Sequence, residues 1–224
     1  CLSNECNNYA DSQCLGKNAF VVTIGKPNNY AVEGTMNNTA ETWNQRYLST
    51  NHSLSMPRTF LMEYRHFLPK KGWALDLAMG LGHNADVLAH HGLQVIGVDF
   101  SWVALRLAKE TYPRLHVVLA ELPRIHFQPA SFDVILNFWF LDRRLFPMMK
   151  SLLKPGGVIF FETKRYDEDV IDPIGNPDYL LKPNELKEVF GDWKTLVYEE
   201  YVRVTSHGGP QPAAHLLARK PGKT

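Results

Sequence analysis

The sequence has few cysteines, almost no net charge and no long apolar run, and each shortage excludes a class of protein. Its three cysteines, Cys1, Cys6 and Cys14, lie in one polar end of the 224-residue chain. Because their number is odd and no histidine lies among them, we interpret them as incidental thiols and expect no disulfide framework and no metal site. Lys and Arg number 24 and Asp and Glu 23, which gives no overall attraction to nucleic acid or anionic lipid. No apolar run approaches the roughly 20 residues of a membrane span. We therefore expect a cytoplasmic protein with no nucleic-acid or membrane partner.

Two parts of the chain differ in composition. With 45% hydrophobic residues, the whole sequence is typical of a globular protein that can bury its own core. Residues 1–35, however, are rich in Asn, lack a helical period and do not resemble a signal peptide. We predict that they are a polar extension, disordered or non-native, and that residues 36–224 form a single domain.

Apolar runs alternate with amphipathic stretches after Met36. A helix through about Ser49 is predicted after the N-cap candidates 37–39, and a second helix from about Pro57 to Leu68. Buried strands are predicted at 73–79, 93–100, 116–120, 132–140 and 157–163, with helices near 83–91, 102–110 and 143–153 between them. A helix at about 183–190 and an antiparallel hairpin complete the chain. Continuous apolar strands with helical crossovers indicate an α/β domain whose parallel sheet is covered on both faces.

A glycine turn and an acidic residue mark a candidate nucleoside site. The first strand runs into Gly80 and Gly82, where the backbone can turn tightly and approach a ligand closely. Asp99 ends the second strand, and a carboxylate there can accept both hydroxyls of a ribose. Ligands of open parallel sheets bind at the carboxyl ends of the strands. The spacing and position together indicate a nucleoside cofactor.

Two classes of cofactor use this geometry. The string from Gly80 to Ala85 fits the fingerprint of an NAD-dependent Rossmann oxidoreductase. Asp76 argues against that reading, because a carboxylate would repel a pyrophosphate and attract a cationic ligand. The sequence also has no Tyr-x-x-x-Lys set for hydride transfer at the strand ends. A sulfonium methyl donor therefore fits better.

Four segments carry a further signal: ALDLAMGLGHNADVLAHHGLQVIGVDFS, FDVILNFWFLDRRLFP, LLKPGGVIFFET and WNQRY. They resemble the class I S-adenosylmethionine-dependent methyltransferases, closest to the small bacterial TehB-like (tellurite-resistance) branch of that family. The resemblance covers about residues 40–220. It implies a Rossmann-like fold with a seven-stranded, mostly parallel sheet, an antiparallel C-terminal strand and helices on both faces. It also implies methyl transfer from S-adenosylmethionine to a small-molecule thiol, chalcogen, amine or hydroxyl.

The resemblance assigns cofactor contacts residue by residue. The methionine loop comprises Asp76, Ala78, Gly80 and Gly82. Asp99 holds the ribose, Phe100 and Ser101 line the adenine side, and Glu121 and Leu122 follow the third strand near the adenine. Asn137 borders the sulfonium. Trp43, Arg46 and Tyr47 match a helix that closes over the cofactor.

Other readings of these residues stay open. Trp43 and Tyr47 are four apart on a helix and can be core, Asp99 can cap a helix, and Glu121 can be a solvated charge. Because the sulfonium methyl is already activated, we expect no indispensable catalytic side chain. Our candidate acceptor pocket comprises Phe138, Trp139, Phe140, Arg143 and Tyr166. A monomer or homodimer is expected, and a catalytically silent cofactor-binding module is a further alternative.

Overall fold

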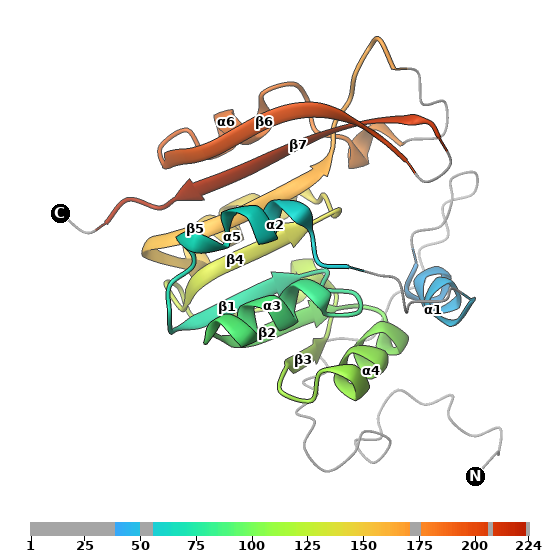
Figure 1. The fold of residues 1–224 in the computed structure, drawn as a ribbon, viewed down its shortest axis with the longest axis vertical. Coiled ribbons are helices and arrows are strands. Elements are labelled where there is room, and N and C mark those ends of the chain that lie inside the picture. The colour runs from blue at the N-terminus through green and yellow to red at the C-terminus, as the bar shows by residue number, and fades with distance from the viewer. Residues whose placement is uncertain (1–38, 50–55, 171–175, 206–207, 223–224) are drawn as a thin grey trace.

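The computed structural model describes residues 39–49, 56–170, 176–205 and 208–222, so residues 1–35 lie outside the described part. Seven strands form one sheet in the order β3-β2-β1-β4-β5-β7-β6 (Figure 1). The strands are β1 (Trp73–Leu77), β2 (Gln94–Asp99), β3 (His116–Leu119), β4 (Phe132–Phe138), β5 (Leu153–Lys164), β6 (Lys194–Val204) and β7 (Pro210–Arg219). All neighbours from β3 to β5 pair in parallel, and β7 pairs antiparallel with both β5 and β6. The predicted α/β class and the antiparallel C-terminal strand are confirmed.

Helices cover both faces of the sheet. They are α1 (Ala40–Ser49), α2 (Thr59–Tyr64), α3 (His83–His91), α4 (Trp102–Thr111), α5 (Phe146–Leu152) and α6 (Glu185–Val189). Short 3-10 turns lie at Arg65–Phe67, Leu122–Arg124, Arg143–Leu145 and Pro177–Tyr179. No helix in the described ranges is both long enough and apolar enough to cross a membrane.

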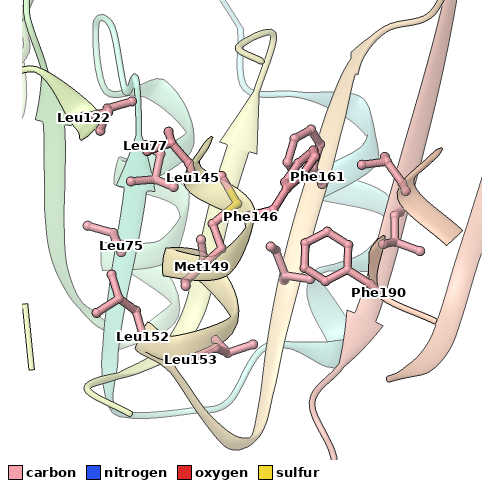
Figure 2. Close-up of a cluster of buried hydrophobic side chains, with 14 of the residues drawn as sticks. Leu75, Leu77, Leu122, Leu145, Phe146, Met149, Leu152, Leu153, Phe161 and Phe190 are labelled. Carbon is pink, nitrogen blue, oxygen red and sulfur yellow. The ribbon is translucent and has the colours of Figure 1, made fainter. Parts of the chain in front are cut away.

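Two apolar clusters hold the helices to the sheet. On one face, side chains of α5 and α6 pack with Leu75, Leu77 and Phe161 of the strands (Figure 2). On the other face, Phe60 of α2 and Leu88 of α3 pack with neighbours that include Phe160. Because successive strand residues point to opposite faces, the adjacent pair Phe160 and Phe161 serves one cluster each. The strands are continuous apolar runs in the sequence because both faces of the sheet are buried.

Several observed boundaries differ from the predicted ones, and three of these differences change an element. The second helix begins at Thr59 and continues only as a 3-10 turn after Tyr64. The helix expected over residues 143–153 is a 3-10 turn followed by α5. β5 begins at Leu153, before the predicted residue 157, because Leu153 pairs with Phe132 of β4.

The carboxyl ends of the parallel strands form the edge that carries the candidate site. The register pairs Asp76 of β1 with Gly97 of β2, which places Asp99 two residues further toward that edge. On the other side of β1, Leu77 pairs with Asn137 of β4. α1 lies beyond these strand ends and contacts α4 (Figure 1). The fold thus brings the predicted cofactor residues from five segments to one edge.

Candidate functional site

The loop between β1 and α3 has a tightly turned backbone. Ala78, Gly80 and Gly82 have φ values of 53°, 55° and 79°, in the left-handed region. Such a value is uncommon for a residue other than glycine, and strained backbone of this kind clusters at ligand sites. A Cβ atom added to Gly80 would lie only 2.7 Å from the Tyr47 hydroxyl. Glycine is therefore needed at residue 80 for both its conformation and its close approach to α1.

Asp99 fastens this loop to β2. Its Oδ2 accepts a hydrogen bond of 2.8 Å from the Gly80 amide, and its Oδ1 accepts one of 2.8 Å from the Ser101 amide. Burial raises the pKa of Asp99 to about 6, although the amides of Ser101, Gly80 and Phe100 oppose the shift. The helix cap of α4 is Ser101, whose hydroxyl accepts from the Ala104 amide, so capping does not account for Asp99. Each Asp99 oxygen has a further lone pair with which to accept a ligand hydroxyl.

Asp76 lies beneath the same loop and is almost fully buried, with 1% of its surface exposed. Its Oδ2 atom has no hydrogen-bond partner among the described residues. Burial and the neighbouring Asp99 carboxylate raise the pKa of Asp76 to about 8, against the effect of the Ala85 amide. A buried carboxylate without a partner is costly, and a cation is the group that would relieve it.

Helix α1 packs against the loop through an aromatic face. The Trp43 and Tyr47 rings lie 5.8 Å apart, and the Arg46 guanidinium lies 4.8 Å from the centre of the Trp43 ring. The Tyr47 hydroxyl lies close to Gly80, and burial together with the Asp99 carboxylate raises the pKa of Tyr47. The predicted closing helix therefore reaches the glycine loop.

Sequence reasoning missed Asn44, which anchors α1. Asn44 is buried, and its Oδ1 accepts a hydrogen bond of 2.7 Å from the Ser101 hydroxyl. Because Asn44 and Tyr47 are three residues apart, they lie on neighbouring positions of one helix face. That spacing was the signal by which the sequence could have marked Asn44 as part of the site. The cap and this bond occupy the Ser101 hydroxyl, so its predicted place beside adenine stays a prediction.

The residues predicted near adenine lie after β3. The Ala120 amide donates to the Asp99 carbonyl, which keeps this segment next to β2. Glu121 forms an ion pair with Arg124 at 3.1 Å, and Leu122 is buried in the core beside α5. Phe100, between Asp99 and Ser101, is partly exposed. The adenine contacts of Glu121, Leu122 and Phe100 stay predictions.

Asn137 is buried and lies one residue before the end of β4. Its Nδ2 donates a hydrogen bond of 2.7 Å to the Phe140 carbonyl. Its Oδ1 is buried and has no hydrogen-bond partner within the described ranges. Asn137 pairs with Leu77 of β1, so this oxygen lies near Asp76 at the same end of the sheet. Like the Oδ2 atom of Asp76, it is a buried acceptor that a ligand donor would satisfy.

The predicted acceptor residues do not gather in one pocket. Phe138 is buried in the core beside α2 and α3, whereas half of the Tyr166 surface is exposed. Arg143 holds both carboxylate oxygens of Glu185, at 2.6 and 2.8 Å, and also two backbone carbonyls. Arg143 thus fastens α6, and its contact with an acceptor stays a prediction. Phe140 packs against the core, and Trp139 lies against the guanidinium groups of Arg58 and Arg203.

Trp139 belongs to a group that sequence reasoning missed. We call Arg58, Trp139, Glu162, Tyr201 and Arg203 the Trp139 cluster. Its members come from the start of α2, the end of β4, β5 and β6. No motif joins residues so far apart in the chain, so the sequence contained no signal for this cluster. Across the described residues, no group of three or more His, Cys, Asp or Glu side chains is placed to hold a metal ion.

Comparison with known proteins supplies an independent view. Residues 74–157 match a family model described as a methyltransferase domain. A ubiquinone biosynthesis O-methyltransferase of Albidiferax ferrireducens is 32% identical over 134 residues, covering 52% of this chain and 51% of the relative. A probable S-adenosylmethionine-dependent methyltransferase of Mycobacterium tuberculosis is 35% identical over 68 residues, covering 30% of this chain and 25% of the relative. The chain thus spans about half or less of the length of these relatives.

The fold matches solved structures over a longer stretch. The crystal structure of TehB from Haemophilus influenzae superposes with a TM-score of 0.66 at 22% identity, covering 80% of this chain and 67% of that one. At this identity the match supports the fold alone. The matched family segment contains Asp76, the glycine loop, Asp99 and Asn137.

Proposed function

We propose that the chain is a class I S-adenosylmethionine-dependent methyltransferase that transfers a methyl group from S-adenosylmethionine to a small-molecule acceptor, a proposal that the family match over residues 74–157 and the similar methyltransferases support. The observation that carries this proposal is the buried acidic pair Asp76 and Asp99 at the glycine loop. Thiol, chalcogen, amine and hydroxyl groups are the candidate nucleophiles.

The residues present fit this cofactor. S-adenosylmethionine carries positive charge on its sulfonium and amino groups, and Asp76 supplies a buried carboxylate oxygen with no partner in the described structure. Asp99 keeps free lone pairs for the ribose hydroxyls. A dinucleotide fits less well, because its pyrophosphate would lie beside two carboxylates at the same loop. The acidic pair thus favours the methyl donor over NAD.

The cofactor, when bound, supplies an already activated methyl group. The protein's own part is to hold donor and acceptor in line and to exclude water. In this proposal, Asp76 and Asp99 bind the cofactor, Asn137 supplies a polar contact at the β4 end, and α1 covers the loop with Trp43 and Tyr47. We expect no indispensable general base for a soft nucleophile such as a thiolate.

Calorimetric titration tests the cofactor assignment. S-adenosylmethionine and S-adenosylhomocysteine are expected to bind with micromolar affinity, and NADH is expected not to bind. Asp99→Ala should abolish binding, whereas Asp192→Asn, which removes an exposed carboxylate paired with Lys150, should not change it. Binding of NADH alone would sink the methyltransferase proposal. Cofactor binding without methyl transfer to any acceptor would favour a silent binding module instead.

A further inference from the structure

The Trp139 cluster places two cations at one aromatic ring. The guanidinium carbon of Arg58 lies 4.9 Å from the centre of the indole ring, and that of Arg203 lies 4.6 Å from it. Both distances are within the range of cation–π attraction. Positive charges repel each other, so this convergence costs free energy unless an anion offsets it.

The backbone at Trp139 is fixed in an unusual conformation. Its φ of 57° is in the left-handed region, where a bulky side chain is rare. The Trp139 amide donates a hydrogen bond of 2.7 Å to the Glu162 carbonyl, and Asn137 holds the Phe140 carbonyl in the same turn. Strain of this kind persists where the surrounding structure enforces it, often at ligand sites.

Polar donors in the cluster lack acceptors. The indole Nε1 is buried without a hydrogen-bond partner among the described residues. The Arg58 and Arg203 side chains interact with the Glu162 carboxylate through charge, and no close salt bridge or side-chain hydrogen bond joins either of them to another described residue. Elsewhere in the protein, Arg143 holds Glu185 and Arg106 pairs with Glu110 at 3.2 Å. An arginine carries five N–H donors, so the two arginines and the indole have donors with which to bind an acceptor group.

The charges of the cluster match a monoanion. Glu162 interacts with Arg58, Tyr201 and Arg203, and burial raises its pKa against the effect of the arginines. The Tyr201 side chain on β6 forms a hydrogen bond with the Glu162 carboxylate on β5. Two guanidinium groups and one carboxylate leave one net positive charge. A planar carboxylate suits that charge and the forked geometry of arginine, whereas a phosphate dianion would be repelled more strongly by Glu162.

The cluster borders the proposed cofactor site. The Arg58 amide donates a hydrogen bond of 2.8 Å to Asn84 of α3, the helix that follows the glycine loop. Trp139 lies two residues beyond Asn137, which pairs with Leu77 of β1. An anion held here would therefore lie on the β4 side of the loop, next to the acidic pair.

We propose that the Trp139 cluster binds a carboxylate group of the methyl acceptor, with Arg58, Arg203 and the indole N–H as donors. The assignment rests on the proposed function and narrows its substrate class to acidic small molecules. It leaves the methyl donor to the acidic pair and the glycine loop.

Matched ligands test this assignment. Acetate, benzoate, phenylacetate and indole-3-acetate are titrated calorimetrically into the complex with S-adenosylhomocysteine, each beside its uncharged amide and beside inorganic phosphate. At least one carboxylate should bind tenfold or more tightly than its amide and than phosphate. Arg203→Gln should weaken that carboxylate at least tenfold while S-adenosylhomocysteine binding stays unchanged.

Arg106→Gln is the matched control, because Arg106 also lies over an indole, that of Trp102, but is paired with Glu110. It should leave both affinities unchanged. Equal binding of every acid and its amide, tighter binding of phosphate, or an unaffected Arg203→Gln variant would overturn the carboxylate site. Failure of S-adenosylhomocysteine to bind the unaltered protein would instead overturn the proposed function on which the site rests.

Discussion

Replacing Asp76 by Asn should stabilise the protein and weaken cofactor binding, and these opposite effects come from one buried charge. The pKa of Asp76 is raised from 3.8 to about 8, mainly through burial. Between about pH 4 and pH 8 the folded state therefore holds a proton that the unfolded state has released. Stability is greatest at the acidic end of this window and declines by up to about 1.4 kcal/mol per pH unit as the pH rises.

Asparagine cannot ionise, so the Asp76→Asn variant should lack this part of the decline. Urea unfolding at pH 5, 6 and 7 measures it as the difference between the two proteins, which includes the coupling of Asp76 to Asp99. We expect the variant to be more stable at pH 7 by about 2 to 4 kcal/mol, with the gain shrinking toward pH 5.

The same substitution should weaken S-adenosylmethionine binding at least tenfold, because an amide offers a cation no charge. In the unaltered protein, affinity should rise roughly twentyfold from pH 6 to pH 7.5 as Asp76 becomes ionised, and the variant should lose this dependence. Asp192→Asn controls for the removal of a negative charge. A variant that is less stable at pH 7, or that binds the cofactor as tightly as the unaltered protein, would refute the reasoning.

Three further substitutions address the parts around the site. Asn44→Ala removes the acceptor of the Ser101 hydroxyl and should cost about 1 to 3 kcal/mol in cofactor affinity, with faster amide exchange in α1 than in the sheet. Gly80→Ala places a Cβ atom 2.7 Å from the Tyr47 hydroxyl, at a residue whose φ is in the left-handed region. The variant should still fold, and calorimetry should show cofactor affinity at least tenfold weaker. Arg143→Ala should lower the free energy of unfolding by about 1 to 2 kcal/mol through loss of the Glu185 pair, while the acceptor KM stays unchanged. Unchanged amide exchange in α1 would contradict the expectation for Asn44→Ala, and unchanged cofactor affinity would contradict that for Gly80→Ala. A raised acceptor KM would contradict the expectation for Arg143→Ala.

The sheet and the acidic pair could be predicted because their signals are local. Each buried strand is a continuous apolar run, and Asp76, Gly80 and Asp99 follow the strand ends at fixed spacing. Helix ends were less predictable, since pairing of Leu153 with Phe132 extends β5 into the segment expected to be helical. Tertiary pairing there overrides the local pattern.

The acceptor side depended on packing that the sequence does not encode locally. Arg143 stands beside an aromatic run in the sequence, yet it bonds to Glu185, which lies 42 positions away. Arg58 and Arg203 converge on Trp139 only because α2, β4 and β6 reach the same edge of the sheet. A single sequence contains no spacing that links these residues.

An assay of methyl transfer is the most direct test of the proposed methyltransferase function. The protein is incubated with methyl-labelled S-adenosylmethionine and a panel of acidic small molecules bearing thiol, chalcogen, amine or hydroxyl groups, beside Asp76→Asn. We expect the label to move to an acceptor with formation of an equal amount of S-adenosylhomocysteine, and we expect the Asp76→Asn variant to lose this transfer. Tight binding of S-adenosylmethionine with no label transferred to any acceptor would contradict it.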